Sequence, residues 1–229
     1  MDLEPSNRFQ EIITELRTVF SGRGKILDSL IPPIVFLLFN AALGLNAALG
    51  ASLGTALLIG LYRAFKRQPL IYAFGGLGGI LVAVIIARFL GRSEGFFLPG
   101  LLTGSLTFIL CLVSVLVKRP LVAWTSCMTR RWPLEWYWHD RVRPAYSEVT
   151  LAWTLFFGLR LLLQFQLFRQ EAAQALGWVQ LLTGWPALIL LLIGSYLYGL
   201  WRLGNLGGPS VEEFKSGAQP PWLGQKRGF

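Results

Sequence analysis

The amino-acid sequence predicts an all-α fold: a polytopic membrane bundle of six transmembrane helices with both termini in the cytoplasm. Of the 229 residues, 54% are hydrophobic and only 14% are charged, whereas a soluble domain usually carries about a quarter charged residues. The charges stand between apolar runs of about twenty residues, the length that crosses a hydrocarbon core of roughly 30 Å. The basic residues also lie almost entirely on one side of the successive runs, which is typical of membrane proteins.

The apolar runs predict the spans, and the loops between them predict the orientation. The spans fall at about residues 26–43, 45–65, 69–90, 96–117, 149–168 and 179–201. Of the 21 Lys and Arg residues, 17 lie in the terminal segments, in the loop between the second and third spans, or in the loop between the fourth and fifth. Because cytoplasmic loops are rich in Lys and Arg, both termini are expected in the cytoplasm. We interpret the net charge of +9 as a topology signal rather than as a nucleic-acid site.

Three parts are predicted along the chain. Residues 1–25 form an amphipathic cytoplasmic helix, residues 26–202 form the six-span membrane domain, and residues 203–229 form a flexible tail rich in Gly and Pro. The N-terminal helix has apolar residues at helical spacing. It lies either on the membrane surface or on the cytoplasmic loops of the protein itself, and both alternatives stay open.

The long loop at residues 118–147 is predicted to lie against the inner leaflet. Aromatic rings favour the headgroup level and arginines favour anionic lipids. The residues expected to contact anionic lipids or a membrane-protein partner are Trp124, Arg130, Arg131, Trp132, Trp136, Trp138, Arg141 and Arg143. Basic residues mixed with aromatic ones also bind single-stranded nucleic acid, but a loop held at the membrane makes that interpretation unfavourable, so no nucleic-acid partner is expected.

A second candidate site surrounds Arg160, inside the predicted fifth span. A charged side chain at this depth costs roughly 2.5–3.5 kcal/mol even on lenient insertion scales, so it needs a partner or a wet cavity. Gln164 lies four residues on and shares its helix face; Asn40 and Glu94 are the other polar residues expected nearby. These four side chains form either a polar pocket that binds an anion or gates ions, or a structural contact that anchors the fifth helix. The structural alternative is favoured, because one charge does not make a pathway.

Glycines in the predicted spans indicate helix packing. Small residues at G-x-x-x-G spacing let helix backbones approach closely in lipid. The pairs are Gly50 with Gly54, Gly75 with Gly79, and Gly100 with Gly104. Homo-oligomerisation through these faces is an open alternative.

Neither catalysis nor a metal or cofactor site is predicted. His139 is the only histidine, and Cys111 and Cys127 fit neither a disulfide framework nor a zinc site. The sequence has no Ser/His/Asp set, no paired intramembrane aspartates and no H-E-x-x-H motif. An enzyme is therefore not expected.

Four segments carry a family resemblance. They read GRGKILDSLIPP at 22–33, FLGRSEGFFLPG at 89–100, LVSVLVKRPLV at 112–122 and FGLRLLLQ at 157–164. Together they resemble an uncharacterised bacterial six-span membrane protein family, a domain of unknown function that is distantly similar to intracellular septation protein A. The resemblance covers about residues 22–202 and implies a protein of the bacterial cytoplasmic membrane, or of an internal membrane of equivalent topology. The link of septation protein A to envelope synthesis and division is not carried over to this chain.

Two functional hypotheses follow from the sequence. The first is a non-enzymatic membrane protein that acts by binding, as an assembly, scaffold or cell-envelope factor engaging the inner leaflet or a membrane-protein partner. The second is a small transporter or channel with its polar site around Arg160. The first is favoured, because the polar and aromatic residues concentrate in the cytoplasmic loop while the membrane interior is almost wholly apolar.

Overall fold

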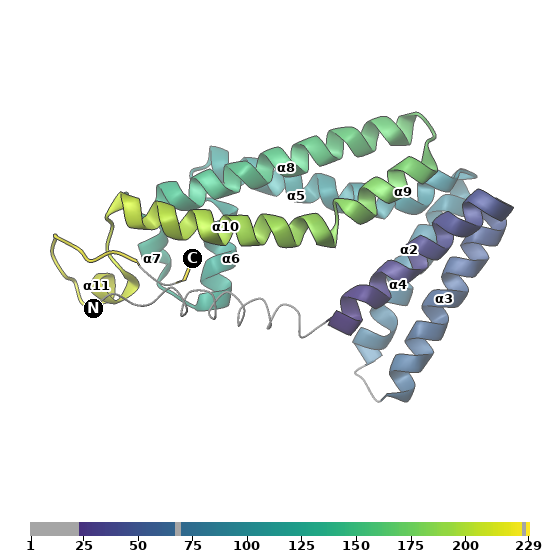
Figure 1. Cartoon of the computed structure of the whole chain (residues 1–229), viewed down its shortest axis with the longest axis horizontal. Helices are drawn as coiled ribbons and strands as arrows, with labels where there is room; N and C mark the ends of the chain where they lie inside the picture. The colour runs from purple at the N-terminus through teal and green to yellow at the C-terminus, as the bar shows by residue number, and fades with distance from the viewer. Residues whose placement is uncertain (1–22, 67–69, 226–227) are drawn as a thin grey trace. The chain divides into compact units, whose positions relative to one another are not determined.

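The computed structural model describes residues 23–66, 70–225 and 228–229, and every regular element in these ranges is a helix (Figure 1). The described chain divides into two compact units, unit 1 (Met1–Phe96) and unit 2 (Phe97–Phe229), each of which is described by itself. The amphipathic helix predicted for residues 1–25 falls almost wholly outside the described residues. The predicted all-helical fold class is confirmed for the described ranges.

Unit 1 is built from three long helices. They are α2 (Arg23–Leu43), α3 (Leu45–Phe65) and α4 (Leu70–Leu90), followed by the short η1 (Ser93–Phe97), which reaches the start of unit 2. Only Gly44 separates α2 from α3, and its φ of 81° is a backbone conformation that favours glycine. Consecutive helices of this unit pack against each other, α2 on α3 and α3 on α4.

Unit 2 combines long and short helices. They are α5 (Leu98–Leu116), α6 (Leu121–Arg130), α7 (Leu134–Tyr137), α8 (Arg143–Arg169), α9 (Ala173–Leu182), α10 (Trp185–Leu206) and α11 (Val211–Lys215). The long helices α5, α8 and α10 run side by side, and α6 lies across their direction (Figure 1). The close contact of α5 with α8 depends on Gly158, where a Cβ would come within 2.9 Å of the Phe108 ring.

Two predicted boundaries differ from the structure. Helix α8 begins at Arg143, six residues before the predicted fifth span, because Pro144 in its first turn starts a helix readily. The predicted sixth span is two helices, since Thr183 and Gly184 separate α9 from α10. Pro186 in the first turn of α10 explains part of this break, because proline is favoured where a helix starts and not inside one.

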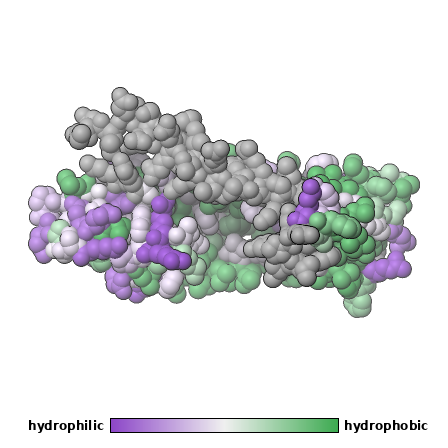
Figure 2. Space-filling model, turned by 90° about the horizontal axis from the view of Figure 1, so that it is seen from below, coloured by the Kyte–Doolittle hydropathy of each residue, from purple (hydrophilic) through white to green (hydrophobic). Residues whose placement is uncertain are grey.

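Four helical segments in the described residues are long and apolar enough to cross a membrane. They are Leu45–Phe65, Ser93–Leu116, Arg143–Arg169 and Ala173–Leu206. Two shorter apolar helices, Leu30–Leu43 and Gly75–Leu90, lie within α2 and α4. The outer faces of the long helices carry large apolar side chains, as Leu155, Leu159 and Leu162 do on α8. In Figure 2 hydrophobic residues follow the long helices of unit 2, and hydrophilic residues gather at the end that holds α7 and α11.

This polar end of unit 2 is a folded head with its own core. The head comprises α6, α7, the first turns of α8, the last turns of α10, α11 and the residues after it. Trp136, Tyr137 and Tyr146 are fully buried at its centre. Trp136 Nε1 donates to the Pro209 carbonyl at 2.9 Å, and Tyr137 Oη lies 3.1 Å from Ser126 Oγ. The core thus joins the loop between the fourth and fifth predicted spans to the segment that follows the sixth.

Residues 203–229, predicted as a flexible tail, hold a helix and several buried side chains where the structure describes them. Helix α11 starts with a capping box, in which Ser210 and Glu213 bond each other's backbone N–H groups. The Glu213 carboxylate also accepts from Leu223 N at 2.7 Å and from Gly224 N at 3.4 Å. These bonds fold the segment back on α11, a contact that its Gly and Pro content gave no reason to expect.

Candidate functional site

The eight aromatic and basic residues predicted to lie at the inner leaflet have different environments in the head. Trp136 is fully buried. Arg130, Trp132, Trp138 and Arg143 are partly buried, whereas Trp124, Arg131 and Arg141 are exposed. The segment is therefore a folded part of the head, and only some of its predicted contact residues face outward.

Cationic side chains of the head stack on its aromatic rings. The guanidinium carbons of Arg119, Arg130 and Arg141 lie 4.5 Å, 5.2 Å and 5.7 Å from the ring centroids of Trp138, Trp132 and Trp222, respectively. Such contacts stabilise by about 0.5–1 kcal/mol each at exposed sites.

Two of these arginines also bond the chain beyond α10. Arg130 Nε donates to the Phe229 carbonyl at 3.1 Å, and Arg141 Nη1 donates to the Gly207 carbonyl at 3.4 Å. The ring of Phe229 stacks on Tyr146 with centroids 4.3 Å apart. Part of the predicted membrane-binding charge is thus used to fix the head internally.

Tyr137 is shielded from water at the centre of the head. Burial raises the pKa of its phenol to about 12, and the bond with Ser126 offsets only part of this effect. Tyr137 is therefore a neutral structural group over the physiological pH range and not an acid or base.

Internal contacts use only part of the outward face of α6: Trp124 lies edge-on against Trp138, with ring centroids 5.8 Å apart, and Arg119 stacks on the same ring. Trp124 and Met128 stand four residues apart and are 39% and 76% exposed, and Thr125 and Thr129 lie beside them. Exposed cations stand at both ends of the helix: Lys118 and Arg119 before it, and Arg131 after it. We call Trp124, Met128, Lys118, Arg119 and Arg131 the α6 ridge.

Two further exposed aromatic residues lie in the last turns of α10. Tyr198 and Trp201 are 41% and 60% exposed, and their ring centroids are 5.7 Å apart. Amphipathic rings of this kind favour the membrane–water interface. Trp124 on α6 is likewise an exposed aromatic residue.

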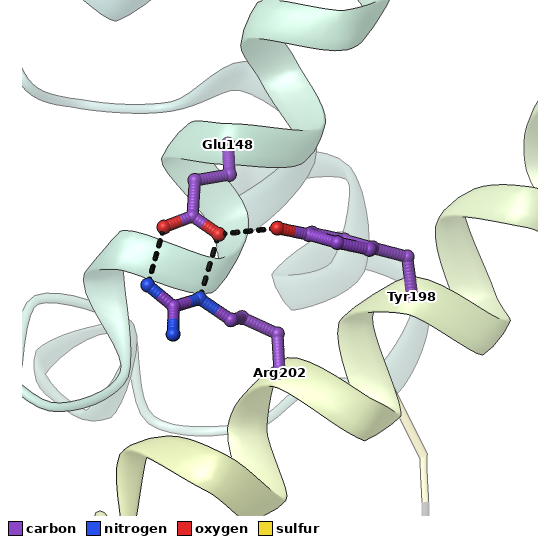
Figure 3. Close-up of polar contacts among 3 residues, drawn as sticks. All are labelled: Glu148, Tyr198 and Arg202. Carbon is purple, nitrogen blue, oxygen red and sulfur yellow. Dashed lines mark hydrogen bonds and ion pairs between the residues drawn. The ribbon is translucent and has the colours of Figure 1, made fainter.

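Three polar side chains join α8 to α10 in the same region (Figure 3). Arg202 donates from Nε and Nη2 to the two carboxylate oxygens of Glu148, at 2.8 Å and 2.7 Å. The Tyr198 hydroxyl donates to the same carboxylate at 2.7 Å. This cluster was not predicted from the apolar runs, although the sequence contains a signal for it. Glu148 directly precedes the predicted fifth span and Arg202 directly follows the sixth, so opposite charges stand at adjoining helix ends.

The predicted intramembrane site is distributed over both units. Arg160 and Gln164 lie on α8 in unit 2, where Gln164 is buried and Arg160 is half-buried. Asn40 and Glu94 lie in unit 1, where Asn40 Oδ1 accepts from Ser93 Oγ at 2.7 Å and Glu94 is buried. Each pair lies within its own unit, and the four-residue site stays a prediction.

Of the six glycines predicted to pack helices, one lies in a close contact. A Cβ at Gly100 would meet the Gln180 side chain at 2.7 Å, and Gln180 Nε2 donates to the Phe97 carbonyl at 3.0 Å. At the other five, Gly50, Gly54, Gly75, Gly79 and Gly104, no described heavy atom lies within 4 Å of a built Cβ. Helix packing through those five positions stays a prediction.

Apolar segments of spanning length among the described helices define the class of integral membrane proteins. The chain belongs to the family described as Protein of unknown function (DUF3159), which matches residues 20–199. The match agrees with the predicted resemblance to an uncharacterised family. Comparison with curated proteins and with solved structures gave no match.

Proposed function

We propose that this chain is a non-enzymatic integral membrane protein that docks its folded head on the anionic inner leaflet through the α6 ridge. Its proposed topology has six spans, formed by α2, α3, α4, α5, α8 and the broken pair α9–α10, with both termini in the cytoplasm. Support for the two additional spans comes from α2 and α4, which are each 21 residues long, enough for about 30 Å. Support for the orientation comes from the 17 basic residues in the terminal segments and in the two loops predicted to be cytoplasmic.

One observation carries the docking proposal: α6 exposes Trp124 and Met128, and exposed cations flank the helix at Lys118, Arg119 and Arg131. Trp124 and Met128 would enter the headgroup region, while Lys118 and Arg131 would lie beside lipid phosphates. A basic residue near an anionic surface contributes about 1 kcal/mol. Since α6 lies between the end of α5 and the start of α8, the ridge is held at the membrane surface by two spans.

The experiment measures which lipid contacts Trp124. The full chain is placed in vesicles of phosphatidylcholine and phosphatidylglycerol in which only one of the two lipids is brominated, and tryptophan quenching is recorded. We expect less quenching in Trp124→Phe than in the wild type. This loss of quenching should be larger with brominated phosphatidylglycerol than with brominated phosphatidylcholine. The double variant Lys118→Gln/Arg131→Gln should lose that lipid preference.

Trp222→Phe is the matched control, since Trp222 stacks on Arg141 inside the head. Equal quenching of the wild type and Trp124→Phe with both lipids would reject the docking surface. Protection of Trp124 from both lipids, with a crosslink to another protein, would instead identify a membrane-protein partner. An envelope-assembly role is proposed only for that outcome.

A small transporter or channel is the second candidate, and the break between α9 and α10 favours it. Broken helices in membrane proteins form ion and substrate sites. Solute flux in proteoliposomes that falls in Arg160→Gln would support transport, whereas flux unchanged by this substitution would remove Arg160 from any pathway.

A further inference from the structure

Arg160 and Gln164 lie on the stripe of α8 that faces its neighbours in unit 2. Trp153, Phe157, Arg160 and Gln164 follow one another at spacings of four, three and four, so they share one side of the helix. Trp153 Nε1 donates to Ser195 Oγ on α10 at 2.8 Å. The stripe is therefore directed at the interior of unit 2 and not at lipid.

Both side chains hold donors that lack an acceptor. Gln164 is only 1% exposed. Within the described part of the chain, Gln164 Nε2 and Arg160 Nε are buried and have no hydrogen-bond partner. Unpaired buried donors are costly, and a buried charge more so. Because both orphan atoms are donors, the group that would satisfy them must offer acceptors, and a negative charge on that group would also offset the charge of Arg160.

The direction of the Arg160 side chain does not favour escape to the nearer end of α8. A Cα–Cβ bond in a helix tilts toward the helix N-terminus, and so the Arg160 side chain starts in the direction of Trp153 rather than of Arg169. Reaching the surface beyond Arg169 would require the side chain to turn back along nine residues, about 13 Å at the rise of an α-helix. A negatively charged partner close to Arg160 would therefore compensate its charge more readily than solvent beyond Arg169.

The antiparallel register of α8 and α10 places the helix break at the same level. Trp153 is paired with Ser195 and Glu148 with Arg202, so five residues forward on α8 match seven residues back on α10. Extended from Trp153, this ratio brings Arg160 level with the start of α10, which begins at Trp185, and Gln164 level with α9. The amino end of α10 therefore lies at the level of Arg160. The first N–H groups of a helix have no partner within it and form a positive end that attracts anions.

We propose that Arg160, Gln164 and the amino end of α10 bind one anion within the membrane, through a carboxylate or phosphate group. The anion would accept from the guanidinium and the amide and would neutralise Arg160. The site is independent of the α6 ridge and requires no transport. An anionic lipid phosphate and a small soluble anion both offer negatively charged oxygen acceptors. The experiment distinguishes these two sources.

The experiment measures anion binding to the full chain purified in a mild detergent. Native mass spectrometry reports retained phosphatidylglycerol, and isothermal calorimetry reports inorganic phosphate and acetate. We expect one bound anion per chain from one of these sources and at least tenfold weaker binding in Arg160→Gln. Arg169→Gln is the matched control, because Arg169 is an exposed arginine at the end of the same helix, and it should bind as the wild type does.

Gln164→Glu keeps the proposal testable if Arg160→Gln does not fold. It places a carboxylate four residues from Arg160, where it would substitute for the ligand. We expect this variant to melt at a higher temperature than the anion-free wild type and to lose anion binding. Retained binding in Gln164→Glu, or a wild type that binds neither phosphatidylglycerol nor phosphate nor acetate, would overturn the site.

Discussion

Arg202 and Glu148 form a bidentate ion pair between residues that are 54 positions apart in the chain. Arginine and carboxylate match in this geometry, which adds orientation to attraction. Because one partner lies in the second turn of α8 and the other near the end of α10, the pair fixes how far the two helices slide along each other. The exposed rings of Tyr198 and Trp201 lie in the same part of α10. The ion pair therefore also fixes the position of these rings along α8.

Removing one partner of this pair should destabilise the chain. Glu148→Gln leaves Arg202 without its counter-ion, and we expect a fall in Tm of about 2–4 °C, the shift that a modest loss of stability causes in a chain of this size. Asp140→Asn removes the long, exposed Asp140–Arg143 contact of 3.6 Å and should leave Tm unchanged. The reversed pair Glu148→Arg/Arg202→Glu should recover part of the loss. Failure of Glu148→Gln to lower the Tm would show that the pair is dispensable.

Gly199→Ala should release the last described residues from the head. The Phe229 ring lies directly against Gly199, so an added methyl group would collide with it. We expect faster proteolysis after α11 and faster hydrogen exchange there. Gly194→Ala in the same helix meets no heavy atom within 4 Å and should behave as the wild type. Equal exchange in the two variants would contradict this packing.

Trp136→Phe tests the core of the head. Phenylalanine fills most of the space but leaves the Pro209 carbonyl without the indole N–H that now bonds it. A lost bond of this kind in a buried site costs about 1–3 kcal/mol. Chemical denaturation followed by circular dichroism would measure the change, and Trp124→Phe on the exposed face of α6 should cost far less. A neutral Trp136→Phe would mean that the bond contributes nothing.

Acid should loosen the segment held by Glu213. The backbone N–H groups of Ser210 and Leu223 lower the pKa of this carboxyl below its ordinary value of 4.5. A group whose pKa is depressed on folding stabilises the fold above its unfolded pKa, and this contribution is lost as the pH falls through the folded pKa. The protection factors of the Leu223 and Gly224 amides, which compare the observed exchange with the intrinsic rate at each pH, should therefore fall below about pH 4.5 in the wild type. In Glu213→Gln these protection factors should already be low at pH 7 and should not show this acid-induced fall.

The helices were predictable from the sequence, because long apolar runs bounded by charges have few alternatives. Leu45–Phe65 is both the predicted second span and helix α3. The break after Leu182 was not predictable from hydropathy, since the residues on both sides of it are apolar and only Gly184 and Pro186 mark it.

The head was harder to predict than the spans. Interleaved Trp and Arg residues are typical both of a membrane-facing loop and of an aromatic core. Burial of Trp136 and exposure of Trp124 depend on long-range contacts, such as that with Pro209, which a local pattern does not contain. The orphan donors of Arg160 and Gln164 were partly foreseen, because a charge in an apolar run requires a partner wherever the run folds.

The depth of Met128 in a bilayer tests the docking proposal most directly. A nitroxide attached to Met128→Cys, with Cys127→Ala removing the neighbouring thiol, would be probed with oxygen and with a water-soluble nickel chelate in vesicles containing phosphatidylglycerol. A label at Leu159→Cys, on the exposed apolar face of α8, gives the reference for the hydrocarbon. Placement of the Met128 label at headgroup depth is the expected result. Full access of the nickel chelate to that label, as in bulk water, would contradict the docking of α6 on the inner leaflet.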